Sequence, residues 1–153
     1  LMLKARDEKL PMPGALATLT PWADLSRTGD TYLTLEGIDP ILGRKMLDKM
    51  AEAYAGKEDM TGPLLSPVYG VYTDKFPPTL IQSGTRDLFL SNCVRLHRKM
   101  KDAGVDVELS VWEAMWHGFT VFSDVELPEA KAGINEVAKF FEAKLQLTAR
   151  PEK

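Results

Sequence analysis

Two short segments carry the side chains best suited to acid–base chemistry. Residues 84–87 (Gly-Thr-Arg-Asp) end on a lone carboxylate, and residues 113–118 (Glu-Ala-Met-Trp-His-Gly) hold a lone imidazole. Each segment follows a stretch predicted to be a buried strand. A carboxylate that accepts a hydrogen bond from an imidazole fixes the tautomer of the ring and stabilises its protonated form. Asp87 and His117 are therefore the candidate acid and base of a nucleophilic triad.

The order of these two residues also indicates where a nucleophile is expected. A carboxylate that precedes the histidine is typical of triads in which the serine comes first in the chain. No serine in this sequence lies in a Gly-x-Ser-x-Gly turn. The sequence thus predicts two members of a triad and lacks the third.

Each candidate also has a purely structural interpretation. Asp87 could cap a helix that starts near Leu88, which is a common use of aspartate, and its position alone leaves both interpretations open. His117 could be a packed loop histidine, although its pairing with Asp87 at a neighbouring strand end favours a functional role. Its aromatic and thioether neighbours in sequence are Trp112, Met115, Trp116, Phe119 and Phe122.

The remaining histidine and the single cysteine do not suggest a second site. His97 lies beside Arg98 and Lys99 and is expected to be solvated, and Cys93 is expected to be a small packing residue. These residues lack metal-ligand spacing. The chain has no glycine-rich phosphate loop and no dinucleotide-binding motif. The sequence therefore predicts neither a metal nor a cofactor.

The hydrophobic pattern predicts alternating strands and helices. The strands are expected at residues 14–19, 79–84 and 105–112. The helices are expected at residues 1–9, 40–55, 90–103 and 127–147, with a long surface loop at 20–39 and an irregular stretch at 57–78. This order implies right-handed crossovers and a parallel sheet, and therefore the α/β class.

Individual residues are expected to begin, end and orient these helices. Asp39 is the predicted N-cap of the second helix, Pro40 its first residue, and Gly56 its end. Its apolar positions are Ile41, Leu42, Met46, Leu47, Met50 and Tyr54. The inward residues of the third helix are Val94, Leu96, Met100 and Ala103, with Arg95 outward; those of the last are Ile134, Val137, Phe140, Phe141 and Leu145.

Composition narrows the function classes. The 153 residues are 44% hydrophobic and 27% charged with a net charge of −3, which gives no reason to expect nucleic-acid binding. No apolar run reaches the roughly 18 residues of a membrane span. One cysteine excludes an internal disulfide framework and suits the cytoplasm.

The start of the sequence suggests that more of the sheet lies upstream. Residues 1–9 resemble the last turns of a helix that has no cap before it. The strand at 14–19 would be an apolar edge strand without a partner, which folded proteins avoid.

Along nearly its whole length the sequence resembles the hormone-sensitive-lipase-like branch of the α/β-hydrolases, the bacterial carboxylesterases. Residues 10–25 (Leu-Pro-x-Pro-Gly-Ala-Leu, then Thr-Pro-Trp-Ala-Asp-Leu) are similar to the family's sixth strand and following loop. Residues 65–82 are similar to the approach to its seventh strand. Residues 84–91 resemble the acid motif and carry the catalytic carboxylate onto Asp87. Residues 103–117 resemble the eighth strand and histidine loop and carry the base onto His117.

The resemblance implies a specific role for the chain. Residues 1–153 would be the C-terminal part of a single α/β-hydrolase domain, with three mostly parallel strands and flanking helices. The activity would be hydrolysis of a small carboxylic ester by a Ser-His-Asp triad. The family's oxyanion motif (His-Gly-Gly-Gly) and nucleophile turn (Gly-Asp-Ser-Ala-Gly) are absent, so the chain alone is predicted to be inactive and to need the N-terminal half of its domain.

Three further expectations accompany this interpretation. The family's homodimer contact would involve residues 107–111 and the exposed side of residues 127–147. A non-catalytic hydrolase-like domain that binds a ligand or a partner is the alternative function. An unrelated flavodoxin-like module is a third hypothesis, which the series of motifs disfavours.

Overall fold

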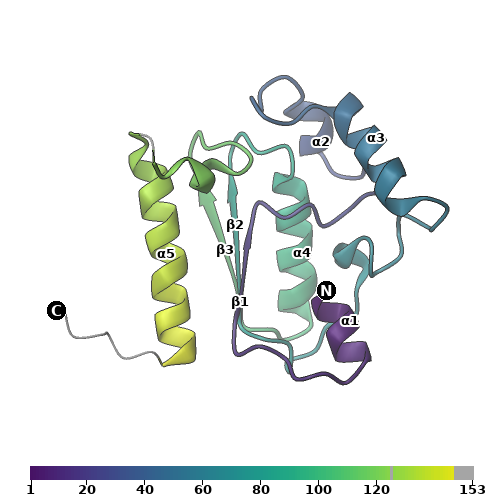
Figure 1. Ribbon diagram of the computed structural model, residues 1–153, viewed down its shortest axis with the longest axis vertical. Coiled ribbons are helices and arrows are strands. Elements are labelled where there is room, and N and C mark those ends of the chain that lie inside the picture. The colour runs from purple at the N-terminus through teal and green to yellow at the C-terminus, as the bar shows by residue number, and fades with distance from the viewer. Residues whose placement is uncertain (125, 147–153) are drawn as a thin grey trace.

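A sheet of three parallel strands forms the centre of the molecule (Figure 1). In this computed structural model, which describes residues 1–124 and 126–146, the strands are β1 (Leu16–Leu19), β2 (Thr79–Gly84) and β3 (Val107–Trp112), in that order across the sheet. Both neighbouring pairs are parallel. The predicted sheet is therefore confirmed, and all three carboxyl ends lie along one edge, where the loops that follow them meet.

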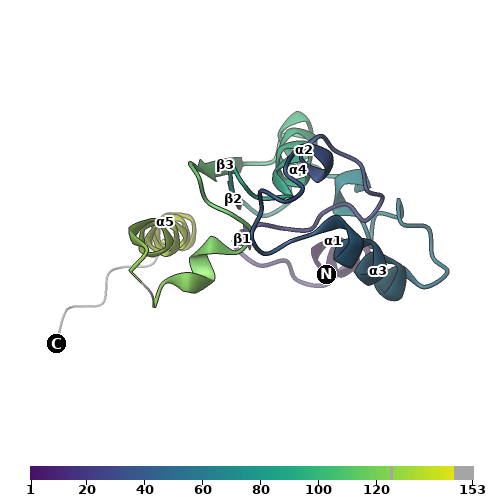
Figure 2. The ribbon, with the colours of Figure 1, turned by 90° about the horizontal axis from the view of Figure 1, so that it is seen from above.

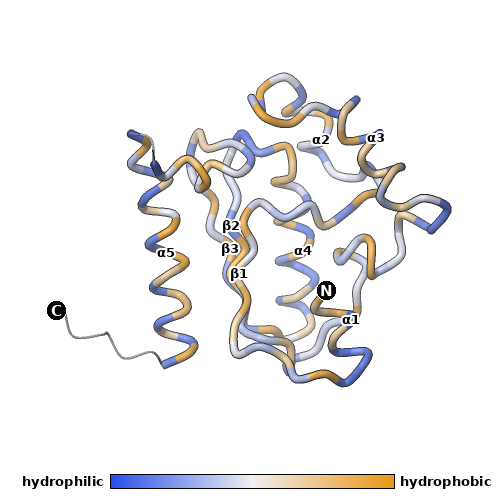
Figure 3. The backbone as a smooth tube through the Cα atoms, viewed as in Figure 1, coloured by the Kyte–Doolittle hydropathy of each residue, from blue (hydrophilic) through white to orange (hydrophobic). Residues whose placement is uncertain are grey.

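Helices cover both faces of this sheet (Figures 1 and 2). Helix α5 (Pro128–Leu145) lies on one face, while α4 (Leu90–Asp102) and the short α1 (Met2–Asp7) lie on the other. β2 is buried along its whole length and alternates between the faces. Leu80 packs with Phe140 of α5, whereas Ile81 packs with α4 residues. Figure 3 shows hydrophobic and hydrophilic colours alternating along α5, the pattern of a helix with one face against the sheet.

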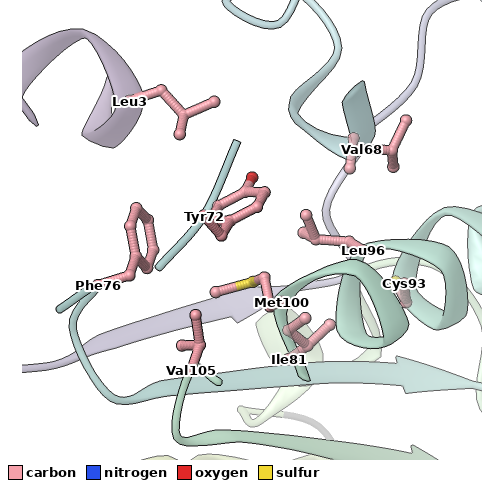
Figure 4. Close-up of a cluster of buried hydrophobic side chains, with 10 residues drawn as sticks. Leu3, Val68, Tyr72, Phe76, Ile81, Cys93, Leu96, Met100 and Val105 are labelled. Atoms are coloured by element: carbon pink, nitrogen blue, oxygen red, sulfur yellow. The ribbon is translucent and has the colours of Figure 1, made fainter. Parts of the chain in front are cut away.

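The largest core cluster lies between α4 and the sheet (Figure 4). Its buried residues include Leu3, Val68, Tyr72, Phe76, Ile81, Cys93, Leu96, Met100 and Val105. Burial raises the pKa of Tyr72 to about 12, and its hydroxyl donates to the Pro67 carbonyl oxygen at 2.8 Å. This cluster joins α1 and the 3₁₀ helix η1 (Pro67–Tyr69) to α4 and fixes α4 against the strand that leads to Asp87.

The second predicted helix starts later than its sequence suggests. Helix α3 spans Arg44–Ala55 and has Gly43, not Asp39, as its N-cap. The Asp39 carboxylate instead accepts the backbone N–H groups of Ile41 and Leu42 in a local turn. Pro40 therefore follows the first residue of that turn and does not begin a helix. The helix ends at Gly56 as predicted, with a φ of +59° that suits glycine.

The stretch predicted as a surface loop at 20–39 contains buried structure. It includes the short helix α2 (Thr31–Thr34), and Ala23, Asp24 and Leu25 are buried. The Asp24 carboxylate pairs with Arg95 of α4, so Arg95 does not simply face outward as expected. This ion pair fixes the segment after β1 against α4.

Several predicted inward positions are in fact exposed. The buried residues of α3 are Leu47, Ala51 and Ala55, which recur every fourth position, and this spacing leaves Met46, Met50 and Tyr54 at the surface. Ile41 is also exposed, in the turn before the helix. Val94, Ile134 and Leu145 are also exposed.

His97, which was expected to be solvated, is half-buried on α4. Its pKa is lowered by burial and, to a smaller degree, by the positive charges of Lys101 and Arg98. The predicted end of the last helix at Leu147 lies outside the described residues.

Candidate active site

Asp87 lies in the turn that follows β2 and is fully buried. Its Oδ1 accepts the backbone N–H of Phe89 at 3.0 Å, and its Oδ2 accepts the Ser83 hydroxyl at 2.8 Å. Asp87 is not the N-cap of α4: the N-cap is Phe89, which lacks a side-chain cap hydrogen bond, so the bond from Phe89 belongs to the turn before the helix. This bond uses only part of the carboxylate, so Oδ1 is able to accept a second hydrogen bond.

The loop after β3 lies directly over the end of β2. A Cβ added to Gly84 would overlap the Met115 carbonyl, so only glycine permits this close approach. Two hydrogen bonds hold the loop there: Arg86 N–H donates to the Met115 oxygen at 2.9 Å, and Ala114 N–H donates to the Thr85 hydroxyl at 2.7 Å. The Gly-Thr-Arg-Asp segment therefore positions the histidine loop as well as the carboxylate.

This arrangement brings His117 and Asp87 together. The distance from His117 Nδ1 to Asp87 Oδ1 is 3.3 Å, so the hydrogen bond predicted from the sequence is present. The His117 side chain is 25% exposed while that of Asp87 is not exposed at all. With a proton on Nδ1 directed at the carboxylate, Nε2 keeps a lone pair for general-base chemistry.

Neighbouring aromatic rings restrict the orientation of the imidazole. Phe89 meets the His117 ring edge-on, with centroids 5.1 Å apart. Trp22 in turn stacks on Phe89, with centroids also 5.1 Å apart. Phe89 is 2% exposed, so its ring is itself fixed in the core. The imidazole is therefore held by packing as well as by Asp87.

Two hydroxyl residues at this site were not identified from the sequence. Ser83 donates to Asp87, and the Thr20 hydroxyl accepts the N–H of Gly118 at 3.1 Å. Both side chains lie at the carboxyl ends of parallel strands, where sites are commonly built. Their position at strand ends was the one indication in the sequence. It could not single out Ser83 and Thr20, because serine and threonine are common at strand ends.

The segment after β1 also holds the turn that carries Asp87. Asp39 Oδ2 accepts the N–H of Leu88 at 2.9 Å, and the Thr31 hydroxyl donates to the Leu88 carbonyl at 2.9 Å. Thr31 also accepts the N–H of Ser91, and Ser91 accepts that of Thr31. The backbone of Leu88 and Ser91, just after Asp87, is thus bonded to residues 49 to 60 positions earlier.

No second chemical centre stands out in the described part of the chain. Cys93 is buried in the core, as expected, and its thiol pKa is raised mainly by burial and further by Asp87. Within residues 1–124 and 126–146 there is no group of three or more His, Cys, Asp or Glu residues placed to hold a metal ion. Over the same residues, no helix combines the length and apolar character that crossing a bilayer requires.

The fold and the acid–base pair define a class of protein. A parallel sheet covered by helices, with a carboxylate after one strand and a histidine after the next, is the arrangement of the α/β-hydrolases. A protein family described as "alpha/beta hydrolase fold" matches residues 1–121, and the chain belongs to this family.

Individual relatives agree with this assignment. An acetyl-hydrolase of Streptomyces hygroscopicus is 35% identical over 136 residues, which cover 89% of this chain and 44% of the relative. A hormone-sensitive lipase from a metagenome library has 34% identity and a TM-score of 0.89, with 94% of this chain and 48% of that one covered. An esterase/lipase from an uncultured bacterium has 32% identity and a TM-score of 0.89, with coverage of 95% and 48%. The chain spans about half the length of the relatives it matches.

Proposed function

We propose that this chain supplies the acid, Asp87, and the base, His117, of a Ser-His-Asp triad that hydrolyses carboxylic esters. The observation that carries this proposal is the 3.3 Å contact between His117 Nδ1 and a fully buried Asp87. A buried carboxylate with a small number of fixed donors is suited to orient an imidazole and to stabilise the imidazolium that forms during attack.

The proposed reaction follows from this pairing. His117 Nε2 takes the proton of a serine hydroxyl as the serine attacks the ester carbonyl, and then returns it to the leaving alkoxide. A water molecule repeats the cycle and releases the acid. The serine and the oxyanion donors are proposed to lie in an N-terminal half of the same domain, outside these 153 residues. The length of the relatives, about twice that of the matched region, supports this division.

The proposed substrates are small esters. Support comes from the names of relatives, an acetyl-hydrolase and an esterase, together with the acid–base geometry. A cytoplasmic location remains a prediction that rests on the single cysteine. A homodimer through β3 and α5 also remains a prediction, for which exposed Val111 and Ile134 are candidate contacts.

Replacement of His117 tests the proposal directly. In the full-length protein, His117→Ala is expected to lower kcat on a p-nitrophenyl ester by about 10⁴-fold or more, because loss of a triad member removes activation of the serine. Asp87→Asn is expected to have a similar effect, since it favours the wrong histidine tautomer.

His97→Ala is the matched control for this experiment. His97 is the other histidine of the chain and lies on α4, where it makes no contact with Asp87 among the described hydrogen bonds. Its replacement is expected to leave kcat within about twofold. Near-normal turnover of His117→Ala would reject the triad and favour the non-catalytic, ligand-binding alternative.

A further inference from the structure

We propose that Thr20 is a positioning residue that holds the histidine loop in its reactive geometry. The inference rests on the proposed role of His117 as the base. Thr20 does not touch His117 itself among the described hydrogen bonds; its hydroxyl accepts the N–H of Gly118, the next residue, at 3.1 Å.

The hydrogen bond between Thr20 and Gly118 joins two distant parts of the chain. Thr20 directly follows β1, and its own N–H donates to the Gln82 carbonyl at 2.7 Å, which continues the β1–β2 ladder by one residue. The loop that starts at the end of β3 crosses above Gly84 of β2 and reaches Thr20 beyond β1. Thr20 and Gly118 are 98 positions apart in sequence. The loop is thus attached to the ends of all three strands.

The backbone of Thr20 is strained. Its φ is +47°, in the left-handed region, where a β-branched side chain is a genuine outlier. Strain of this kind persists only where the surroundings impose it, and it is concentrated at functional sites. Thr20 is also 4% exposed, so the conformation is not that of a free surface turn. The left-handed conformation and the contact with Gly118 occur at the same residue.

His117 lies between two attachments of the loop. Before it, the Met115 carbonyl accepts Arg86 N–H at 2.9 Å. After it come the Thr20 contact with Gly118 and Phe119, which is fully buried beneath α5. Gly118 has a φ of +67°, a left-handed conformation that favours glycine, and the Thr20 hydroxyl accepts its N–H. Loss of the Thr20 hydroxyl would therefore let the imidazole move relative to Asp87.

Thr20→Val isolates the hydroxyl from the shape of the side chain. Valine keeps the β-branch and the strain but cannot accept the Gly118 N–H. In the full-length protein we expect kcat on a p-nitrophenyl ester to fall roughly 10- to 100-fold, because small misplacements of a catalytic group have effects of this size. KM is expected to stay within about twofold, since substrate binding is not altered. Thr20→Ser retains the acceptor and is expected to keep most of the activity.

Two further variants test whether the effect comes from loss of any buried hydroxyl or from misfolding. Thr79→Val is the matched control: Thr79 is also a buried threonine that loses a hydroxyl hydrogen bond, to the Pro77 carbonyl, but it lies at the opposite end of β2. Its kcat is expected to be unchanged. Thr20→Gly removes the hydroxyl and relieves the strain together, so it keeps the test valid if the valine variant does not fold.

Hydrogen exchange of the Gly118 amide gives a readout independent of catalysis. We expect its protection to be lost in the valine and glycine variants and kept in Thr20→Ser. Wild-type kcat and full protection in Thr20→Gly would overturn the positioning role. If His117→Ala retains activity, the proposed function fails instead, while the exchange result still reports on the Thr20 contact.

Discussion

The carboxylate of Asp87 has a different partner on each side. Oδ1 faces His117 and the Phe89 amide, and Oδ2 faces the Ser83 hydroxyl. Because Asp87 is fully buried, water does not replace a missing donor. Each protein donor therefore contributes to the orientation of the carboxylate toward the imidazole.

Ser83→Ala tests this arrangement. The change removes the donor to Oδ2 and is expected to destabilise the full-length protein by about 1.5–3 kcal/mol, the range for hydrogen bonds to charged groups. We also expect kcat to fall about tenfold, because the carboxylate gains freedom to rotate. Urea unfolding and ester hydrolysis measure the two effects.

Ser110→Ala is the control for Ser83→Ala. Ser110 on β3 also donates to a carboxylate, that of Glu136 on α5, at 2.7 Å. This pair lies on the α5 face of the sheet and is not bonded to Asp87 or His117. Its loss is expected to leave kcat unchanged. Equal kcat values for the wild type and Ser83→Ala would show that Ser83 does not orient the acid.

At this scale, residue type and order predicted the contact between Asp87 and His117 but not the residues that support it. The pair could be predicted because each residue comes a few positions after a predicted strand and because the chain has only two histidines. Thr20 could not be found in the same way, because its role depends on a residue 98 positions away. A hydroxyl at a strand end has no distinctive sequence pattern until its partner is placed in space.

Among the elements, α4 depends on the segment that follows β1. The first turns of a helix leave backbone N–H groups without partners inside the helix. At the start of α4, Asp39 accepts the N–H of Leu88 and Thr31 accepts that of Ser91. The segment from α2 to α3 therefore completes the amino end of α4 and fixes the turn that carries Asp87.

Asp39→Ala tests this dependence. Asp39 is 5% exposed, and its loss leaves the Leu88 N–H buried without an acceptor. The free energy of unfolding is expected to fall by about 1–3 kcal/mol, as measured by urea denaturation of the full-length protein. Asp39→Asn keeps one oxygen acceptor and is expected to lie between the wild type and the alanine variant.

The control for Asp39→Ala is Asp59→Ala. Asp59 also accepts the N–H of the residue two positions later, at 2.9 Å, but it does so in an exposed turn. Its loss is expected to leave stability nearly unchanged. If both alanine variants behave alike, Asp39 serves only its local turn and does not support α4.

Asp39 also shows why some helix and strand boundaries were predicted correctly and others were not. β2 was predicted to the residue, because Pro77 and Pro78 mark its start and Gly84 marks its end. The start of α3 was wrong because Asp39 and Pro40 form a typical helix start in sequence, yet Asp39 bonds across to Leu88. A cap directed at a distant element cannot be distinguished from a local one without the fold.

For the molecule as a whole, the outer edge of β1 is the least complete region. The N–H groups of Leu16 and Thr20 donate to the β2 side, so those of the alternating residues Ala17 and Leu19 point away from it. In the described part of the chain β1 pairs only with β2. Beside this edge lies an apolar cavity of about 260 Å³ whose lining includes Leu3, Leu16 and Leu64.

Residues 1–153 are therefore expected to be unstable and inactive alone. An apolar strand edge without a partner tends to associate, and no nucleophile turn is present in the sequence. The test is to express this segment alone and follow thermal unfolding and esterase activity in a dilute sample, with the full-length protein as reference. A sharp unfolding transition from a monomer would show that these residues form a self-sufficient domain.

The attachment of the histidine loop to all three strand ends has a consequence for folding kinetics. The connection from β1 to β2 is more than twice as long as that from β2 to β3. Closing the longer loop costs about 0.9 kcal/mol more in chain entropy, so β2 and β3 are expected to pair first. Thr20 then meets Gly118 only when β1 joins them. Asp87 and His117 would come within reach early, whereas the loop that holds the imidazole would be secured only when β1 joins β2.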